Sequence, residues 1–142
     1  MVDSLTKFER SERMALVRHR DTKPEITIRR IVYAFGFRYR LHRRDLPGAP
    51  DLAFIGRKKA IFVHGCFWHR HPDSSCKLAR MPKSRLDFWE PKLEGNRQRD
   101  LKNQSELDAM GWRFLIVWEC ELRHREQLQN KLLAFLTDGG AE

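Results

Sequence analysis

The sequence predicts an α/β domain built on a mixed central sheet that is flanked by helices. Three observations predict it: a half-buried strand at residues 37–41, an apolar hairpin at 51–64, and a long polar helical stretch at 84–110 that leads to an apolar run at 114–118. Such a run after a helix is typical of a parallel strand reached by a crossover. By length the 142 residues correspond to one domain, and 41% hydrophobic content is enough for one core.

The first marked element is a helix that begins at Thr22. Thr22 and Glu25 have the spacing of a capping box, and Pro24 lies in the first turn. Apolar residues follow at helical spacing, and Gly36 supplies the stop; they are Ile28, Ile31, Val32 and Phe35. Before this helix, residues 4–20 carry a weak apolar stripe among charges, which predicts a helical arm that becomes ordered on DNA.

Three strands are expected next. Residues 37–41 alternate between apolar and basic side chains, which indicates a half-buried strand with a basic outer face. Residues 51–55 and 60–64 are short apolar runs, and the Gly-Arg-Lys-Lys segment between them predicts a hairpin. The hairpin makes Asp51 and His64 neighbours.

The second half of the chain predicts a loop, a helix, a strand and a helix. The loop, residues 65–82, is rich in Cys and His, and Pro91 within the helical stretch 84–110 suggests a kink or two helices. Residues 114–118 predict a strand buried on both faces, and residues 124–136 predict an amphipathic helix. The predicted order is therefore α-β-β-β-α-β-α.

Charge indicates a polyanionic partner. The net charge is +9, and residues 1–44 hold twelve Lys and Arg against five Asp and Glu. A solvated basic surface without a specific partner is the alternative. The sequence has no apolar run long enough to span a membrane, so a soluble intracellular protein is expected.

Four side chains have the composition of a structural zinc site. Cys66, His71 and Cys76 lie within eleven residues, and Cys120 follows the last strand. An odd number of cysteines suits a metal site better than a disulfide framework. Unrelated buried cysteines are the alternative. A zinc ion held by four protein ligands would contribute folding energy and leave no open position for a substrate.

A second pattern is compatible with a nuclease. Asp51 follows Pro50 at the start of a strand, and twelve residues later the next strand ends in Val63 and His64. This resembles a degenerate PD-(D/E)xK arrangement, in which a carboxylate binds Mg²⁺ because that ion prefers hard oxygen ligands. Taken alone, a Pro-Asp pair is more often a simple turn.

Four segments carry a specific family resemblance. They are HGCFWH at residues 64–69, FW at 88–89, NRQRD at 96–100 and GWRFLIVWEC at 111–120. They resemble the very short patch repair (Vsr) DNA mismatch endonucleases, and the likeness extends from Arg10 to the Cys120 region. It implies a restriction-endonuclease-like core and a strand-nicking hydrolase that cuts 5′ to the thymine of a T:G mismatch. The implied function is repair of deaminated 5-methylcytosine, with catalytic Mg²⁺ and structural Zn²⁺.

The resemblance also assigns roles in the active site. Asp51 would bind Mg²⁺ directly, and Val63, where the family has Thr, would bind it through the main-chain carbonyl. Glu25 matches a position near the metal waters, although its capping box explains it equally well. His69 would act as the general base and Asp100 would orient it.

His64 would lie against the phosphate as a polarising group. For both histidines, His64 and His69, a purely structural role is the alternative.

Aromatic residues would read the mismatch. Phe67, Trp68 and Trp89 match residues that wedge between base pairs, and unstacking is easier at a mispair. Met14 would enter from the opposite groove, with phosphates held by Arg10, Arg13, Arg18 and Arg20. A core position is the alternative for the three aromatics, but two adjacent aromatics cannot share one strand face.

The expected organisation is one endonuclease domain over residues 1–142, with a DNA-clamping arm at 1–20 and a catalytic core at 22–136. The expected partner is double-stranded DNA containing a mismatch, bound by a monomer in the bacterial cytoplasm at the nucleoid. Contact with mismatch-repair proteins follows from the resemblance, and no membrane partner is expected. Two alternatives remain: a sequence-specific nuclease acting on undamaged DNA, and a non-catalytic zinc-stabilised DNA-binding module.

Overall fold

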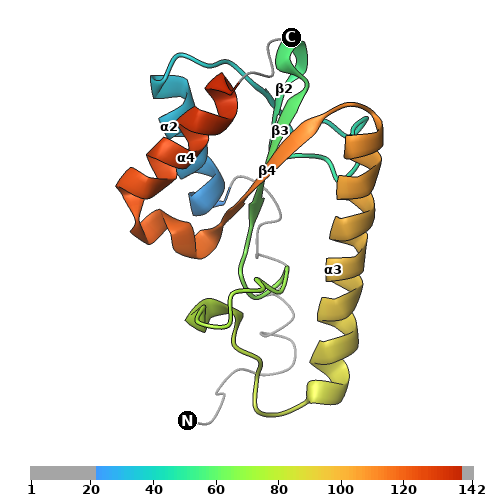
Figure 1. The fold of residues 1–142 in the computed structure, drawn as a ribbon. Helices are drawn as coiled ribbons and strands as arrows, with labels where there is room; N and C mark the ends of the chain where they lie inside the picture. Colours follow the sequence, from blue (N-terminus) through green and yellow to red (C-terminus); the bar gives the residue numbers. More distant parts are fainter. Residues whose placement is uncertain (1–21, 139–142) are drawn as a thin grey trace.

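A computed structural model describes residues 22–138, and its elements follow the predicted order (Figure 1). They are α2 (Lys23–Ala34), β1 (Arg40–Leu41), β2 (Leu52–Phe54), β3 (Lys59–His64), α3 (Leu86–Ala109), β4 (Arg113–Trp118) and α4 (Arg125–Thr137). The predicted α/β class with a mixed sheet is confirmed. The predicted arm, residues 1–20, lies outside the described residues.

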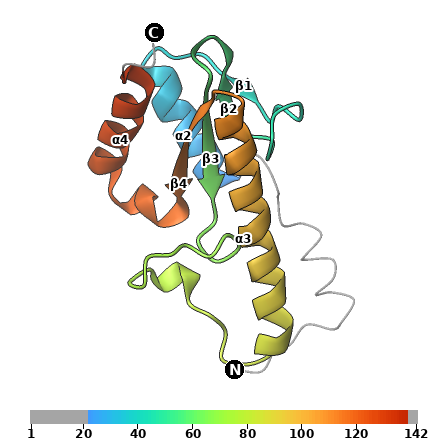
Figure 2. The same cartoon turned by 45° about the vertical axis from the view of Figure 1, so that its right-hand side comes forward.

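The sheet has the order β1-β2-β3-β4 (Figure 2). Strands β1, β2 and β3 are antiparallel, whereas β3 and β4 are parallel, and α3 makes the crossover between them. The parallel pair aligns Val63 with Val117 and His64 with Trp118. The C-terminal ends of β3 and β4 therefore lie at the same end of the sheet, and the segments that follow them begin side by side.

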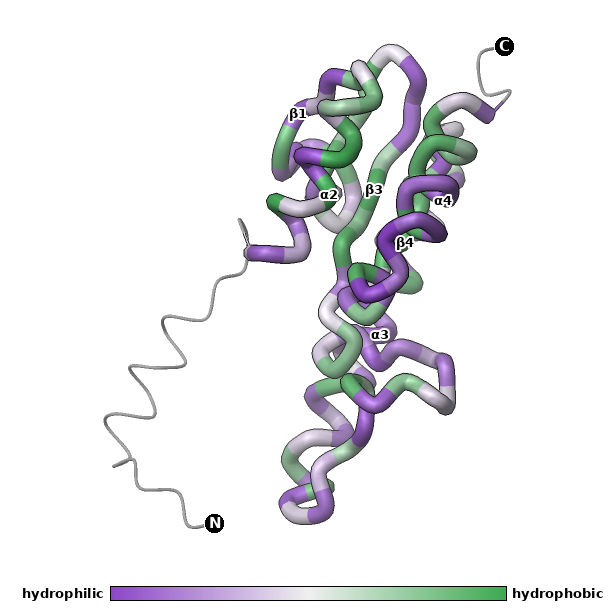
Figure 3. The backbone as a smooth tube through the Cα atoms, turned by 90° about the vertical axis from the view of Figure 1, so that its left-hand side faces the viewer, coloured by the Kyte–Doolittle hydropathy of each residue, from purple (hydrophilic) through white to green (hydrophobic). Residues whose placement is uncertain are grey.

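Helices cover both faces of the sheet, with α2 and α4 on one side and α3 on the other (Figure 1). Successive strand residues alternate between the two layers, so Ile61 packs toward α2 and α4 while Ala60 and Phe62 pack toward α3. Figure 3 shows β3 as mostly hydrophobic along its length. Small side chains at Ala53 and Ala60 leave room for α3 to approach the sheet.

The ends of α2 confirm the sequence signals. Thr22 accepts a hydrogen bond from the Glu25 N–H at 3.4 Å, and the helix ends before Gly36, whose φ of 96° suits glycine. In contrast, the suggestion of two helices around Pro91 is wrong. Helix α3 is continuous, and Pro91 is exposed near its start, where water can satisfy the one carbonyl that loses its partner.

Two strand predictions need correction. The strand expected over residues 37–41 pairs only at Arg40–Leu41, although the alternation survives because Phe37 and Tyr39 pack on the core while Arg38 is exposed. Strand β4 does contact both layers, but most of it is half-buried because it is an edge strand in the described sheet.

The hairpin prediction placed Lys59 in the turn, and the structure places it in β3 with 1% of its surface exposed. Its Nζ donates to the carbonyl oxygens of Phe135 at 2.7 Å and Asp138 at 3.0 Å, at the end of α4. A cation at a helix C-terminus compensates the carbonyls that have no partner within the helix. Within residues 22–138, no helix combines the length and the apolar composition required to cross a bilayer.

Candidate active site and candidate metal centre

A cavity of about 780 Å³ lies between the start of α2, the segment after β1, the end of β3 and the middle of α3. Six of the residues singled out from the sequence line it: Glu25, Asp51, Val63, His64, His69 and Asp100. They come from segments up to 75 residues apart in the chain. The fold therefore brings the predicted catalytic residues to one place.

Asp51 stands just before β2, and its carboxylate is held from one side. Its Oδ2 accepts a hydrogen bond from the Val63 N–H at 2.6 Å, so Asp51 and the end of β3 are neighbours as predicted. Burial raises the pKa of the Asp51 carboxyl to about 7, against the effect of the Val63 hydrogen bond. A buried carboxylate with one oxygen fixed and the other, Oδ1, facing His42 across 4.0 Å suits a cation with a preference for oxygen ligands.

His69 and Asp100 form a second short polar contact in the cavity. Asp100 Oδ2 accepts from His69 Nδ1 at 2.6 Å, which places the ring proton on Nδ1 and leaves Nε2 as the basic nitrogen. His69 lies in the turn after β3, and this turn is tied to α3 because Asn96 donates to the Trp68 carbonyl at 3.0 Å. The pair can accept a proton at a defined atom.

His64 ends β3 and is 5% exposed. Its ring stacks on His69 with centroids 3.8 Å apart and planes within 8°. Burial lowers the pKa of His64 to about 4, and the neighbouring His69 adds to this, so His64 is neutral at pH 7. Its Nδ1 has no hydrogen-bond partner among residues 22–138, which marks it as a group that a ligand can satisfy.

The cavity also holds residues that the sequence analysis did not single out: His42, Arg44, Asn103 and Gln104. His42 is positioned by the structure, because the antiparallel register that pairs Leu41 with Leu52 sets it opposite Asp51. Gly48 allows the segment between β1 and β2 to approach α3 closely, since a Cβ at Gly48 would lie 3.1 Å from the Asn103 Cβ. For Arg44 and Gln104 the sequence contains no distinguishing pattern.

The cysteine and histidine cluster forms beside this cavity. One donor atom from each of Cys66, His71, Cys76 and Cys120 lies within 4.8 Å of the others, so the predicted set could hold a metal ion. Cys120 Sγ is 3.6 Å from His71 Nδ1, and the Cys120 N–H donates to Cys66 Sγ at 3.4 Å. Burial raises the pKa of the Cys66 thiol to about 12, and a metal would displace that proton. Three sulfurs and one imidazole fit the donor preference of zinc.

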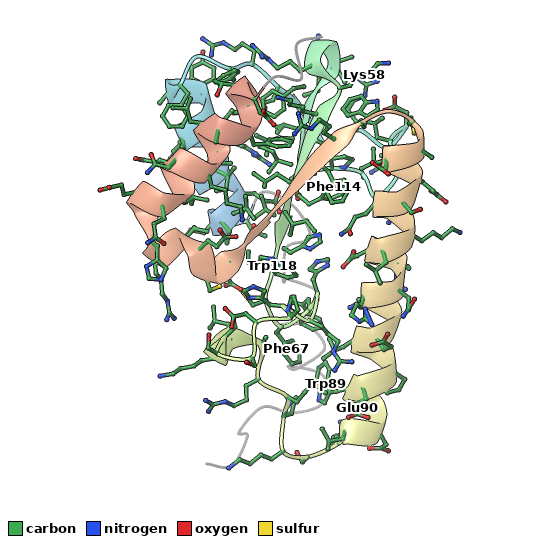
Figure 4. The ribbon with its side chains drawn as sticks, viewed as in Figure 1. Lys58, Phe67, Trp89, Glu90, Phe114 and Trp118 are labelled. Carbon is green, nitrogen blue, oxygen red and sulfur yellow. The ribbon has the colours of Figure 1, made fainter. Side chains whose placement is uncertain are left out.

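Phe67 and Trp89 lie between the loop and the first turns of α3 (Figure 4), and Trp68 is in ring contact with both. Ring centroids of Phe67 and Trp68 are 5.2 Å apart, and those of Phe67 and Trp89 are 5.3 Å apart, all in edge-on contacts. The three are half-buried and belong to neither hydrophobic core cluster. Met14 lies outside the described residues, as do Arg10, Arg13, Arg18 and Arg20.

Comparisons with known proteins place the chain in a family. Residues 2–77 match the family described as DNA mismatch endonuclease Vsr. The chain is 46% identical over 132 residues to "Type II nicking enzyme V.XorIIP" of Xanthomonas oryzae, covering 93% of this chain and 95% of the relative. It is 40% identical over 133 residues to "DNA mismatch endonuclease Vsr" of Escherichia coli, covering 94% and 83%. It is 39% identical over 132 residues to "Type II nicking enzyme V.NmeAIP" of Neisseria meningitidis, covering 93% and 92%.

Proposed function

The chain belongs to the Vsr family of DNA mismatch endonucleases, and from that premise we propose that it nicks double-stranded DNA on the 5′ side of the thymine in a T:G mismatch. This cut would start very short patch repair of deaminated 5-methylcytosine. The observation that carries the proposal is the convergence of Asp51, His64, His69 and Asp100 on one cavity. Two of the clustered aromatics, Phe67 and Trp68, immediately precede His69 in the chain.

His69 is the proposed general base. Its Nδ1–H donates to Asp100, so Nε2 takes the proton from the attacking water while Asp100 stabilises the imidazolium that forms. The stacked ring of His64 is neutral at pH 7, so it adds no positive charge beside His69 in the ground state. His64 is assigned to a phosphate oxygen, to which a ring N–H of the neutral imidazole would donate.

Asp51 is the proposed ligand of a catalytic Mg²⁺, together with the main-chain carbonyl of Val63. When bound, the ion would neutralise charge that develops on the scissile phosphate. The hydrogen bond from the Val63 N–H orients the Asp51 carboxylate before any cation arrives. The substitution of Val for the family's Thr leaves this main-chain group in place.

The cysteine and histidine cluster is the proposed site of a structural Zn²⁺. Its four protein donors leave no position for a substrate, so its role would be to fix the loop after β3 to the end of β4. That loop carries Phe67, Trp68 and His69. The zinc would hold the aromatic and catalytic groups at a fixed separation.

Phe67, Trp68 and Trp89 are the proposed wedge between base pairs. Unstacking one step costs a few kcal/mol, and the cost falls at a mispair. Half-buried aromatics in edge-on contact form a wedge whose shape is set before DNA binds. Selectivity would therefore come partly from the deformability of the mismatched step.

The direct test is a nicking assay with two duplexes that differ only in one T:G pair. Each strand carries a different end label, and the reaction contains Mg²⁺. We expect one nick in the thymine strand, on the 5′ side of that thymine, and no cut in the matched duplex. Equal cutting of both duplexes would favour the second candidate, a sequence-specific nicking enzyme, which the names of two relatives suggest. Binding without any Mg²⁺-dependent cut would favour a DNA-binding module.

The proposed organisation is one domain over residues 1–142 that acts as a monomer, with residues 1–20 as a clamp on the duplex. Because the relatives are bacterial proteins, the proposed place of action is the nucleoid in the cytoplasm. Contact with other mismatch-repair proteins is proposed on the same grounds.

A further inference from the structure

His42 belongs to a second group of ligand-type side chains in the cavity. One donor atom each from Glu25, His42 and Asp51 lies within 4.8 Å of the others. The three come from the first turn of α2, the residue after β1 and the residue before β2. Asp51 is already the proposed metal ligand, and all three side chains line the same cavity as Val63 and His69.

The backbone turns His42 toward Asp51. Its φ is 47°, in the left-handed region that non-glycine residues rarely adopt, and its side chain is 17% exposed. Continuing the β1–β2 register places it opposite Asp51. His42 Nδ1 then lies 4.0 Å from Asp51 Oδ1, which is the carboxylate oxygen that does not accept from Val63.

These separations fit an ion between the two side chains. Ligand atoms about 2.1 Å from one six-coordinate ion stand about 3.0 Å apart when adjacent and about 4.2 Å apart when opposite. The 4.0 Å between His42 Nδ1 and Asp51 Oδ1 lies in this range. The other ring nitrogen, Nε2, is 3.5 Å from Glu25 Oε1. A histidine ligand usually donates its second N–H to a carboxylate, and Glu25 is a carboxylate within reach of Nε2.

We propose that His42 joins Asp51 in binding the catalytic divalent cation, through Nδ1, and that Glu25 would orient His42 by accepting from its Nε2–H. This inference rests on the proposed function, since it concerns the cation held by Asp51. Without the cation, the Arg29 guanidinium donates to His42 Nε2 at 3.1 Å and lies 3.4 Å from Glu25 Oε1. With the cation held by Nδ1, the ring proton would move from Nδ1 to Nε2 and face Glu25, and Arg29 would keep its contact with Glu25.

A nitrogen ligand changes which cation the site prefers. Mg²⁺ favours oxygen ligands, whereas Mn²⁺ and Co²⁺ accept imidazole more readily. The site should therefore bind Mn²⁺ more tightly than Mg²⁺. Removing the imidazole should reduce Mn²⁺ affinity more than Mg²⁺ affinity.

The test titrates the full-length, zinc-loaded protein with Mn²⁺ alone and follows free Mn²⁺ by electron paramagnetic resonance. Pulsed measurements on the bound ion then report ¹⁴N coupling from a directly coordinated imidazole. We expect this coupling in the wild type and its loss in His42→Gln, with Mn²⁺ affinity reduced about tenfold or more. His124→Gln is the matched control, because His124 is exposed at the start of α4, and it should behave as the wild type.

Two further variants separate the possible failures. His69→Gln should keep the ¹⁴N coupling, and a coupling that disappears there but survives in His42→Gln would overturn the assignment. Asp51→Asn should lose Mn²⁺ binding; if it binds as the wild type does, the proposed function loses its metal ligand. If Asp51→Asn loses the ion while His42→Gln keeps full affinity, only the role of His42 is refuted. Should His42→Gln fail to fold, the coupling in the wild type and in His69→Gln decides the question.

Discussion

Two groups of ligand-type residues lie at the same end of β3 and β4, and they differ in what surrounds them. Cys66 and Cys120 each follow the last strand residue by two positions and join a loop cluster whose four donors face one another. Asp51, His64 and His69 instead line an open cavity, in which Val63 donates to Asp51, His69 donates to Asp100 and the His64 ring stacks on His69.

The difference follows from donor chemistry and from geometry. A loop in which only Cys66 is buried cannot hold its shape by burial, so four converging donors can serve as its core. The cavity supplies oxygen and imidazole groups with room beside them, and His64 Nδ1 has no partner in the described part of the chain. One group suits folding, and the other suits chemistry on a bound phosphate.

The largest expected effect is on catalysis, from Asp51→Asn. Nicking of the T:G duplex should fall by about 1,000-fold or more, because charge stabilisation by a bound metal ion is worth several kcal/mol. DNA affinity should stay within about threefold, since the basic surface is unchanged. Single-turnover nicking and a binding titration measure the two quantities. Asp108→Asn, on the exposed side of α3, is the control, and unchanged turnover in Asp51→Asn would refute the metal role.

The next effect is on folding, from Cys76→Ser. Loss of one ligand should release the zinc and lower the midpoint of thermal unfolding by about 10 °C, because structural zinc contributes several kcal/mol to folding. Metal analysis and calorimetry test this, with Ser74→Ala as the neighbouring control. If Cys76→Ser keeps the unfolding temperature of the wild type, the cysteine cluster does not have the proposed role in folding.

The third effect is on the pH dependence of stability. Burial holds the pKa of Asp51 at about 7 in the folded protein, against about 3.9 in the unfolded chain. From about pH 4 to pH 7 Asp51 ionises in the unfolded chain but keeps its proton in the folded protein. The free energy of unfolding of the metal-free protein should therefore fall by at most about 4 kcal/mol over this range and then level off. The Asp51→Asn variant should not show this loss. It should therefore be more stable than the wild type at pH 8, but not at pH 4. Denaturant unfolding without Mg²⁺ measures it, and equal stability of both proteins at pH 8 would contradict it.

The fourth effect concerns the orientation of a base. Asp100→Asn keeps a hydrogen-bond acceptor beside His69 but removes its charge, so kcat should fall by about 100-fold with little change in KM. Glu94→Gln, which removes an exposed carboxylate of α3 outside the cavity, is the control. A loss of under about threefold would argue that the His69–Asp100 pair is structural.

Much of this arrangement follows from local patterns in the sequence. Two apolar runs with a basic turn between them were enough to place Asp51 beside the end of β3, because the strands of a hairpin run antiparallel and the start of the first lies beside the end of the second. The limits of the helices came from Thr22 and Gly36, whose backbone preferences are local. The zinc-type ligand set was recognisable because soft donors were concentrated near one loop.

Features that depend on distant partners were not predicted. Lys59 resembles a turn residue, and only the carbonyls of α4, more than 70 residues later, explain its burial. His42 enters the cavity through a left-handed backbone conformation and through strand register, neither of which a periodic pattern reveals. The proposed roles of His69 and Trp68 came from family resemblance, since a single histidine or tryptophan in a loop has many structural uses.

The smallest expected effect tests whether the loop organised by the cysteine cluster also takes part in recognition. In Trp68→Ala the preference for a T:G duplex over a matched duplex should fall by about tenfold, because a smaller wedge gains less from an easily unstacked step. Phe88→Ala is the matched control, since Phe88 is 45% exposed and contacts Trp89 from outside, with ring centroids 5.0 Å apart. Nicking rates on both duplexes give the ratio. If Trp68→Ala slows both substrates equally, Trp68 supports the loop and does not read DNA. If only the mismatched substrate slows, the metal cluster and the cavity act on one substrate through a shared loop.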